Sequence, residues 1–329
     1  MEYSQWLRYF KLTVAVDGSN TEALDLSDFR VRFSITQAVL GKPTTADITV
    51  YNVSKSTVDR IQVPTNQSVG NRRLKVIIEA GYQDEHATIF QGDLWWKSTG
   101  RESETDTFMR LIAATGDRAH QYAVVNAAIP AGATQAQVFS VVAKSMAEKG
   151  VECPGVPQEL ATTVKLPRGK VMYGMSAKAM QGLADTNNFL WGYGSGGLVA
   201  IPKTPSYDER SDVVVLTSQT GLIGRPKLTV NGVELQCLLN PRVDVGSYIL
   251  IDNRSVQRDA FDTSYQADIV KNVATEDSML SADGLYRVIS REVVGDTRGT
   301  EWYLNLIAEG VNAAVKPMTP TVLNSFTNM

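Results

Sequence analysis

Two passages of alternating residues, in the same order and about half the chain apart, constrain the fold of this 329-residue sequence more than any other feature. The first begins at Gly41-Lys42-Pro43 and the second at Gly224-Arg225-Pro226. Each opens with an alternating apolar and polar run, as in a strand with one buried face, and each ends with a strand that closes on a glycine. The corresponding segments, with the first passage named first, are KVIIEAGY and SYILIDN, IFQGDLWW and LYRVISREVV, and FMRLIAATG and WYLNLIAEG.

The repeated order predicts an internal duplication, which would decide the architecture of the chain. The likeness lies in pattern more than in identity, and unrelated β-domains also resemble one another in composition. From the spacing alone, duplication and shared composition therefore both remain open.

Short β-branched and aromatic runs, separated by turn residues, fill the first and last thirds of the chain and favour antiparallel β-structure. One helix-like stretch, Ser54–Gln62, interrupts the first third. The strands predicted in the first third are Lys11–Val16, Phe29–Ile35, Ala46–Val53, Leu74–Tyr82, Ala87–Trp96 and Thr107–Gly116. The strands predicted in the last third are Asp212–Ser218, Pro226–Leu239, Ser247–Asn253, Leu285–Gly295 and Glu301–Gly310.

The middle third has the pattern of a small α+β region. Thr134 followed by Gln137 predicts a capping box, and apolar residues then recur at helical spacing until Gly150 ends the helix. The residues at this spacing are Val138, Val141, Val142 and Met146. A second helix is predicted to start at Ser176, and a hairpin is predicted over Asn188–Pro202.

The predicted fold class is therefore mainly β with an α+β insert: two similar antiparallel β-barrel domains flank a small α+β middle region. The expected division is an N-terminal barrel at 1–117, a middle region at 118–211, a C-terminal barrel at 212–310 with a long insertion at 254–284, and a tail at 311–329. A further division of the middle region near residue 165 stays open.

Charge and cysteine content exclude several classes of protein. The net charge of −3 lacks the basic excess that binds nucleic acid through its phosphates. Cys153 and Cys237 are the only cysteines, so a reducing compartment is expected during folding. The N-terminus is polar where a signal peptide needs an apolar core, and no apolar run reaches the roughly 18–20 residues that span a bilayer. We expect synthesis in a cytoplasm and no stable membrane binding.

The sequence offers no signature of catalysis. His86 and His120 are the only histidines, and neither has the flanking nucleophile motif that a Ser-His-Asp triad would show. Zinc ligands are not expected either, since the histidines and cysteines never pair at ligand spacing. A pair of carboxylates in a cleft remains open, because its geometry is three-dimensional. We predict a protein that is not an enzyme and has no cofactor and no metal site.

Two other motifs have structural interpretations. Gly192, Gly194 and Gly197 match G-x-G-x-x-G, but a strand rather than a helix follows, so we predict a flexible hairpin tip and no phosphate site. On a strand, Trp95 and Trp96 point to opposite faces, so one is predicted in the core and the other exposed or in an interface.

The repeated passages resemble the baseplate hub proteins of contractile-tailed phages. The stretches GKPTTADITVYNVSKSTVDRI, VIIEAGY, IFQGDL and LIAATG look like the N-terminal barrel of that family. GLIGRPKLTVNGVELQCLLNPRVDVGSYILIDN and GDTRGTEWYLNLIAEG resemble its C-terminal barrel, and VKLPRGKVMYGMSAKAMQGLADTNNFLW resembles the small domain between the barrels. The resemblance covers most of the chain except Arg254–Asp283 and the tail after Gly310.

This resemblance implies a homotrimeric hub in which each subunit contributes two similar barrels. Six pseudo-equivalent modules would then meet a six-fold tail tube on one side and a three-fold central spike on the other. The implied partners are the spike, the tail tube or tube-initiator protein and the tape-measure protein, with DNA only in transit through the channel. The implied location is the tail baseplate of the virion, after assembly in the host cytoplasm. A neutral or acidic channel lining would suit such transit.

Segments outside the repeat, together with the tryptophan pair, are the candidates for partner or subunit contacts. The residues singled out are Trp95, Trp96, Phe261, Tyr265, Met279, Leu280, Leu323 and Phe326. For the tail, an arm that orders on a neighbour and a frayed end both remain open.

Other functions also remain open. A cell-wall hydrolase at the tail tip would need an acid pair or a nucleophile in a cleft, and the hub of a tailocin would look the same from one chain. A carbohydrate-binding β-module would use Trp191 and Tyr193 as a stacking platform.

Overall fold

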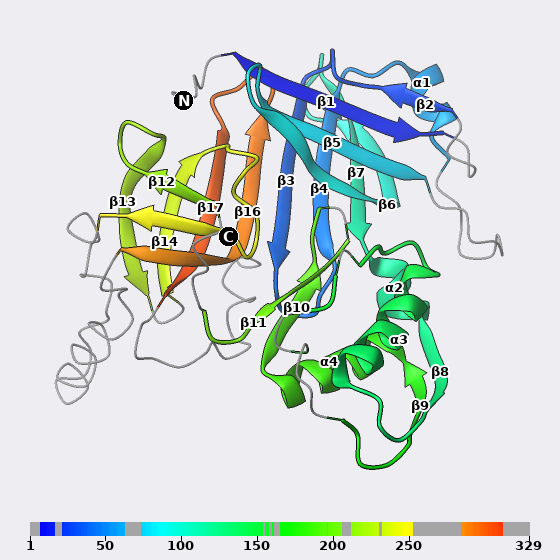
Figure 1. The fold of residues 1–329 in the computed structure, drawn as a ribbon. Helices are drawn as coiled ribbons and strands as arrows, with labels where there is room; N and C mark the ends of the chain where they lie inside the picture. Colours follow the sequence, from blue (N-terminus) through cyan, green and yellow to red (C-terminus); the bar gives the residue numbers. More distant parts are fainter. Residues whose placement is uncertain are drawn as a thin grey trace, which may run out of the picture.

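In the computed structural model, a broad β-sheet forms one end of the molecule and a small α+β region the other (Figure 1). The structure describes residues 7–16, 22–62, 74–153, 155–157, 160, 165–195, 197–205, 212–229, 232–252 and 284–311. The prediction of a mainly β chain with antiparallel sheets and a few helices between two β-rich thirds is confirmed.

Strands dominate both outer thirds. The first third contains β1 (Arg8–Ala15), β2 (Ala23–Asp25), β3 (Val31–Ala38), β4 (Thr44–Tyr51), α1 (Lys55–Arg60), β5 (Lys75–Tyr82), β6 (His86–Arg101) and β7 (Thr107–Thr115). The last third contains β12 (Val213–Leu216), β13 (Leu222–Thr229), β14 (Gly232–Leu238), β15 (Tyr248–Ile251), β16 (Leu285–Asp296) and β17 (Trp302–Gly310). The middle third contains α2 (Asp117–Tyr122), β8 (Val124–Ile129), α3 (Gln135–Ala147), β9 (Lys170–Met175), α4 (Ser176–Asn187), β10 (Phe189–Tyr193) and β11 (Leu198–Pro202).

The strands of the outer thirds join in a single 13-stranded sheet. Its hydrogen-bonded path runs β13-β14-β17-β16-β3-β4-β7-β6-β5-β1-β2, and β15 pairs with both β16 and β12 beside this path. Every pairing is antiparallel except that of β12 with β15. Among the described strands the path does not close on itself, so closure of either half into a barrel stays a prediction.

The strand order repeats within this sheet. The first unit has the order β3-β4-β7-β6-β5-β1, and the second has β13-β14-β17-β16-β15-β12. Strands at corresponding places in the two sheet orders also come in the same order along the chain for all six strands. The direction of the last strand differs, since β1 is antiparallel to β5 whereas β12 is parallel to β15. This shared order supports a duplication over a chance likeness of composition.

One continuous hydrophobic core lies beneath both units. Inward residues such as Ile48 of β4 and Leu306 of β17 belong to the same buried cluster. The ring of Trp302 meets that of Phe33 edge-to-face at a centroid distance of 5.6 Å, so an aromatic contact joins the second unit to the first. The alternating burial along β3, β4 and β14 matches the alternation that predicts strands here.

The stretch Pro226–Leu239, predicted as a single strand run, is two strands of a hairpin. β13 ends at Thr229 and β14 begins at Gly232, and the two strands pair antiparallel with a register shift between Ile223 and Lys227. The Asn231-Gly232 dipeptide is a strong hairpin signal, and it accounts for the difference from the prediction.

The α+β region has its own core, formed by α3, α4 and the β10–β11 hairpin. The predicted capping box is confirmed, because the Gln137 amide donates to Thr134 Oγ1 at 3.3 Å and the Thr134 amide donates to Gln137 Oε1 at 2.9 Å. The helix predicted from Ser176 and the hairpin after it are also confirmed. The sequence pattern does not predict α2, β8 or β9, each of which spans only six residues.

The glycines of the β10–β11 hairpin serve close packing. The Gly194 amide donates to the Gly197 carbonyl at 2.6 Å, which confirms the hairpin. A Cβ atom at Gly192 would lie 2.8 Å from the Ala38 carbonyl oxygen, and one at Gly197 would lie 2.2 Å from the Glu152 carbonyl oxygen. Any side chain at Gly192 would therefore push the hairpin off the end of β3. The predicted hairpin is confirmed, and two of its glycines, Gly192 and Gly197, also permit close contact with backbone.

Candidate functional site

The outward face of the sheet carries a continuous set of polar side chains, which we call the polar sheet face. Gln236 Nε2 on β14 donates to Asn305 Oδ1 on β17 at 3.0 Å, and Asn305 Nδ2 donates to Glu292 Oε2 on β16 at 3.0 Å. Ser34 Oγ on β3 donates to the other Glu292 oxygen at 3.1 Å. This row of hydrogen bonds crosses four strands and passes without interruption from the second unit to the first.

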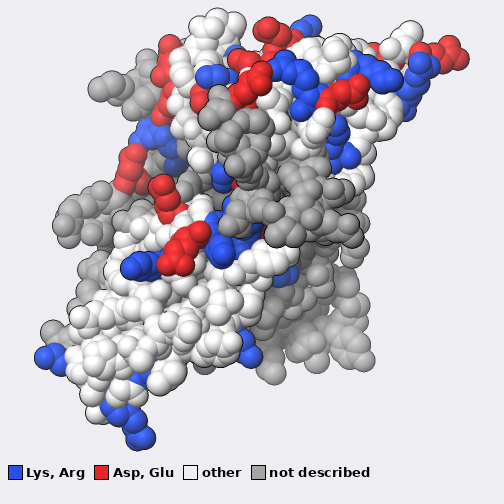
Figure 2. Space-filling model, turned by 90° about the vertical axis from the view of Figure 1, so that its right-hand side faces the viewer, with Lys and Arg blue, Asp and Glu red and all other residues white. Residues whose placement is uncertain are grey.

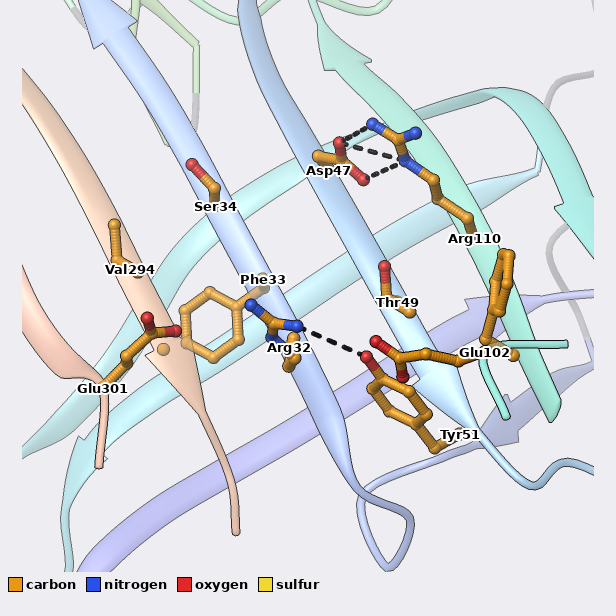
Figure 3. Close-up of a pocket in the computed structure, with 12 residues that line it drawn as sticks. Arg32, Phe33, Ser34, Asp47, Thr49, Tyr51, Glu102, Arg110, Val294 and Glu301 are labelled. Carbon is orange, nitrogen blue, oxygen red and sulfur yellow. Dashed lines mark hydrogen bonds and ion pairs between the residues drawn. The ribbon is translucent and has the colours of Figure 1, made fainter. Parts of the chain in front are cut away.

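The polar sheet face continues on β4 and β7, where Arg110 Nε donates to both Asp47 carboxylate oxygens at 2.8 and 3.1 Å. The hydrogen bond to Asp47 raises the pKa of Arg110. Figure 3 shows Ser34, Asp47 and Arg110 side by side on neighbouring strands. These side chains surround a shallow hollow of about 370 Å³ that also reaches Arg32 and Glu301. Because the charges pair with one another, the face suits contact with solvent more than capture of one ion.

The two units meet where the second half of β16 pairs with β3, which we call the internal junction. β16 pairs with β15 up to Arg287 and with β3 from Ser290 to Asp296, so one strand serves both units. Arg30 Nη2 contacts Asp296 Oδ2 at 2.7 Å, and the Arg30 guanidinium lies 4.8 Å from the centre of the Tyr51 ring. An ion pair therefore closes the junction at the end where β16 stops.

Asp296 is buried and fully hydrogen-bonded. Burial by itself would raise its pKa, but the Arg30 hydrogen bonds and the amides of Arg298 and Gly299 lower it, and the net pKa lies below the usual value. Arg8 Nη1 donates to the carbonyl oxygens of Asp296 at 3.1 Å and Gly299 at 2.7 Å, so β1 also holds the turn after β16.

A buried arginine ties the internal junction to the rest of the molecule. Arg291 is 2% exposed and donates to Gln37 Oε1 at 2.7 Å, to the Val243 carbonyl at 2.7 Å and to the Ile89 carbonyl at 3.3 Å. Burial lowers the pKa of Arg291, and the nearby Asp244 carboxylate opposes that shift. Its acceptors come from three separate segments, so the role of this charge is structural.

Trp95 and Trp96 are the two predicted contact residues that the structure describes. They are 57% and 46% exposed, so the expectation that one of them lies in the core is wrong. The reason is a β-bulge between Leu94 and Trp96, which breaks the strict alternation of side chains along β6. The other predicted contact residues lie outside the described residues, namely Phe261, Tyr265, Met279, Leu280, Leu323 and Phe326.

The α+β region has an apolar surface that the sequence patterns do not predict. The outer side of β8 and β9 exposes Val124, Val171, Tyr173 and Met175, with Tyr122 of α2 beside them. In Figure 2 the lower part of the molecule is white with lysine and arginine side chains at its margin and no acidic ones. Apolar residues occur at successive positions of KVMYGM, so no periodicity distinguishes the exposed side from the buried one.

The two histidines and Cys237 lie in separate parts of the described structure. The His86 ring stacks on Tyr9 at 3.7 Å, and burial lowers the pKa of His120, whose ring lies edge-on to Tyr193 at 6.1 Å. Burial raises the pKa of Cys237 to about 12, which leaves its thiol protonated and inert. Within the described ranges no three His, Cys, Asp or Glu side chains gather as a metal site requires. No helix there is long and apolar enough to cross a membrane.

Comparison with known proteins places this architecture among phage tail proteins. A sequence model of the family described as baseplate hub gp41 matches residues 9–266. The fold is similar to a 43 kDa tail protein of prophage MuSo2 from Shewanella oneidensis, with a TM-score of 0.56, 7% identity, and coverage of 94% of this chain and 98% of that one. It is similar to a tail protein from Neisseria meningitidis, with a TM-score of 0.54, 9% identity, and coverage of 94% and 98%.

The fold is also similar to a chain of the Francisella PdpA-VgrG complex, with a TM-score of 0.50, 8% identity, and coverage of 95% of this chain and 54% of that one. At identities this low the structural likeness concerns the fold alone. Among curated proteins none matches the sequence.

Proposed function

This chain belongs to the baseplate hub gp41 family, and from that premise we propose that it assembles as a homotrimer into a ring with pseudo-six-fold symmetry. In this ring each chain supplies two similar β-modules, residues 1–117 and 212–310, so three chains present six modules. The ring adapts a six-fold tail tube to a three-fold central spike, and it encloses the channel for DNA.

The observation that carries this proposal is the repeated strand order, β3-β4-β7-β6-β5-β1 and β13-β14-β17-β16-β15-β12. A trimer can present six like surfaces only if each chain contains two like units. The internal junction of β16 with β3 gives these units a fixed relation within one chain. The middle region, residues 118–211, lies outside the repeat and is free to make contacts that have three-fold symmetry.

We place the polar sheet face on the channel side of the ring. Its charges include acidic groups such as Glu292 and Asp47, and its arginine Arg110 is neutralised by Asp47. A lining of this kind does not hold the phosphates of passing DNA, whereas a basic lining would retain them. The tape-measure protein would leave by the same route.

Light scattering after size-exclusion chromatography tests the trimer. The expected mass is three times the 36.0 kDa of one chain, either alone or in the presence of the spike and tube-initiator proteins. A chain that stays monomeric with both partners present would contradict the proposed function. A low-resolution map of the assembled particle, with this chain between tube and spike, would locate it in the baseplate.

We also propose that the chain acts without catalysis of its own. The support is that its buried polar groups, such as Arg291, satisfy backbone and side-chain acceptors rather than face a cleft. Zymography on cell-wall substrate is the direct check, and a zone of clearing would replace the structural function with that of a tail-tip hydrolase.

A further inference from the structure

The two units correspond residue by residue around a shared β-bulge. β6 pairs with β7 through a bulge between Leu94 and Trp96, and β16 pairs with β17 through a bulge between Val288 and Ser290. The bulged residues are thus Trp95 and Ile289. The sequence Leu-Ile-Ala lies opposite both bulges, at 111–113 on β7 and at 306–308 on β17. This register makes Ser98 of β6 the counterpart of Glu292 on β16.

The same register extends to the first hairpin of each unit. Ile35 of β3 lies opposite Ala46, which in turn lies opposite Ala113. Leu228 of β13 lies opposite Val233, which in turn lies opposite Ala308. Ile35 and Leu228 are therefore counterparts, and so are their neighbours in each strand, Thr36 with Thr229 and Ser34 with Lys227.

In the second unit the strand after the bulge is covered by β3. Ser290–Asp296 of β16 pairs with β3, with Glu292 opposite Thr36 and Val293 opposite Ile35. Ile289 is 2% exposed and packs with Val39, Val245 and Ile307. The bulge is buried by its own unit, through Val245 and Ile307, and by the end of β3, where the Val39 amide donates to the Ile289 carbonyl at 3.3 Å.

In the first unit no described strand lies on the corresponding edge, where Lys97 Nζ donates to the Val58 and Ile61 carbonyls at the end of α1. β5 pairs with β6 only up to Asp93, so among the described strands the segment Trp95–Arg101 is paired with β7 alone. The counterpart of β3 is β13, which among the described strands lies at the end of the sheet and pairs with β14 alone. One chain thus carries both strands that a second junction would need, β13 and the end of β6. These strands lie too far apart along the sheet to pair within one chain.

The chemistry of the two edges is complementary. The exposed residues of β13 include Ile223, Arg225 and Lys227, whereas the turn that follows β6 exposes Glu102 and Glu104. Glu102 is the counterpart of Asp296, the acid that closes the internal junction with Arg30. Trp95 and Trp96 supply the apolar area that Ile289 supplies internally. Pro226 lacks an N–H group, as edge-strand prolines do, so the pairing would centre on Leu228.

We propose that β13 of a second copy pairs antiparallel with the free edge of β6 in the register of the internal junction. Thr229 then lies opposite Ser98, Leu228 opposite Thr99, and Lys227 opposite Gly100. We assign the edge of β6 to another copy of the chain because β13 corresponds in place and register to β3. Within one chain, β3 already covers the equivalent edge of β16. This inference rests on the homotrimeric hub proposed above, and it specifies which strands join its subunits.

The pairing has two consequences for the assembly. It covers the edges of β13 and β6 on which no described strand lies, so assembly also protects edges that would otherwise recruit other chains. It also continues the polar sheet face from Ser98 of one copy to Lys227 of the next, just as Glu292 now continues to Ser34 within the chain. Trp95 and Trp96 become buried against the second copy.

A disulfide between the two edges tests the register. Thr36 and Glu292 lie directly opposite each other in the internal junction, so Ser98 and Thr229 of two copies have the spacing that a cross-strand disulfide needs. The variant Ser98→Cys with Thr229→Cys is made in a Cys153→Ser chain, because Cys153 is half-buried and Cys237 is buried. Mild oxidation of the assembled protein, followed by non-reducing electrophoresis, should give covalent dimers and trimers.

The matched control moves one cysteine by one residue, Thr99→Cys with Thr229→Cys, which places the thiols on opposite faces of the sheet. We expect roughly tenfold less covalent oligomer from this control, because a slip of one residue turns the side chain to the other face. Equal yields from both pairs would overturn the register. The single-cysteine chains give the background of random collision.

Light scattering on the unoxidised variants separates failure of this inference from failure of the proposed function. Trimers without specific cross-links would overturn the pairing of β13 with β6 and leave the hub function standing. Monomers under all conditions, with no cross-link, would overturn both. Trimers that cross-link only in the stated register would support both.

Discussion

The strand pairs β6–β7 and β16–β17 have the same register around the same bulge but opposite surroundings. Ile289 at the second bulge is 2% exposed, whereas Trp95 at the first is 57% exposed. The difference follows from what lies across each edge, since β3 covers β16 and no described strand covers the end of β6. One chain therefore contains a junction in which β3 pairs with β16, and an equivalent edge on β6 that no described strand covers. The register of the first junction predicts the register of a strand that would pair with β6.

The largest expected difference between the two junctions concerns Arg291 and its counterpart Lys97. Arg291→Ala removes a buried cation and leaves three buried acceptors without a donor, so we expect the free energy of unfolding to fall by about 3–5 kcal/mol. Lys97 is only half-buried and donates to the carbonyls of Val58 at 2.9 Å and Ile61 at 2.5 Å. Lys97→Ala should cost about 1 kcal/mol. Urea denaturation at neutral pH measures both, and equal losses would contradict the comparison.

The bulged residues give the next largest difference. Ile289→Ala leaves a cavity among Val39, Val245 and Ile307, and we expect a loss of about 2–4 kcal/mol in the free energy of unfolding. Trp95→Ala changes an exposed side chain and should shift the stability of the dilute monomer by no more than about 0.5 kcal/mol. Thermal or urea unfolding of dilute protein tests this. A large loss from Trp95→Ala in the monomer would show that the first bulge is already buried within one chain.

The ends of the two strands differ in their response to pH. The pKa of Asp296 is held below its usual value, so its contribution to stability is present above about pH 4 and is lost as the pH falls through the lower, folded-state pKa. Asp296→Asn should cost about 1–2 kcal/mol at pH 7, and that cost should shrink at pH 3. Glu102→Gln is the matched variant at the exposed counterpart of Asp296. Urea midpoints of both variants at the two pH values provide the test.

The smallest expected effect is electrostatic and appears only on assembly. In the proposed register Lys227 of one copy lies diagonally across from Glu102 of the next. Lys227→Glu should weaken self-association by about 0.2–1 kcal/mol, less as salt is raised, and Glu102→Lys in the same chain should restore it. Sedimentation velocity over a concentration series measures the shift. If the two substitutions together weakened self-association by the sum of their separate effects, Lys227 and Glu102 would not be in contact across the interface.

Much of the architecture is predictable from local patterns. Alternation identifies β3, β4, β5 and β14, and the capping box at Thr134 and Gln137 places the start of α3, because these signals depend on neighbouring residues alone. The hairpin turn inside Pro226–Leu239 and the bulge at Trp95 are missed. Both change the face on which side chains lie without changing the composition of the strand.

The candidate site is less predictable than the fold. Trp95 and Trp96 stand out in the sequence as aromatic residues, but nothing near them indicates that both are exposed. The hydrogen-bonded row from Gln236 to Ser34 joins residues far apart in the chain, and the apolar surface on β8 and β9 has no periodic signal. These features depend on which strands become neighbours, and local patterns do not encode that choice.

The order of strands and the existence of two like passages follow from the sequence, because alternation, turn residues and repeated order are properties of the chain read along its length. The sharing of β16 between β15 and β3 was settled only by folding, and so was the edge of β6 that no described strand covers. Long-range pairing depends on which edges meet in space and on what the core of each unit can cover. GRPKLTVNGVELQCLL therefore identifies a second unit in the sequence, but only the folded chain shows that no described strand other than β14 pairs with its strand β13.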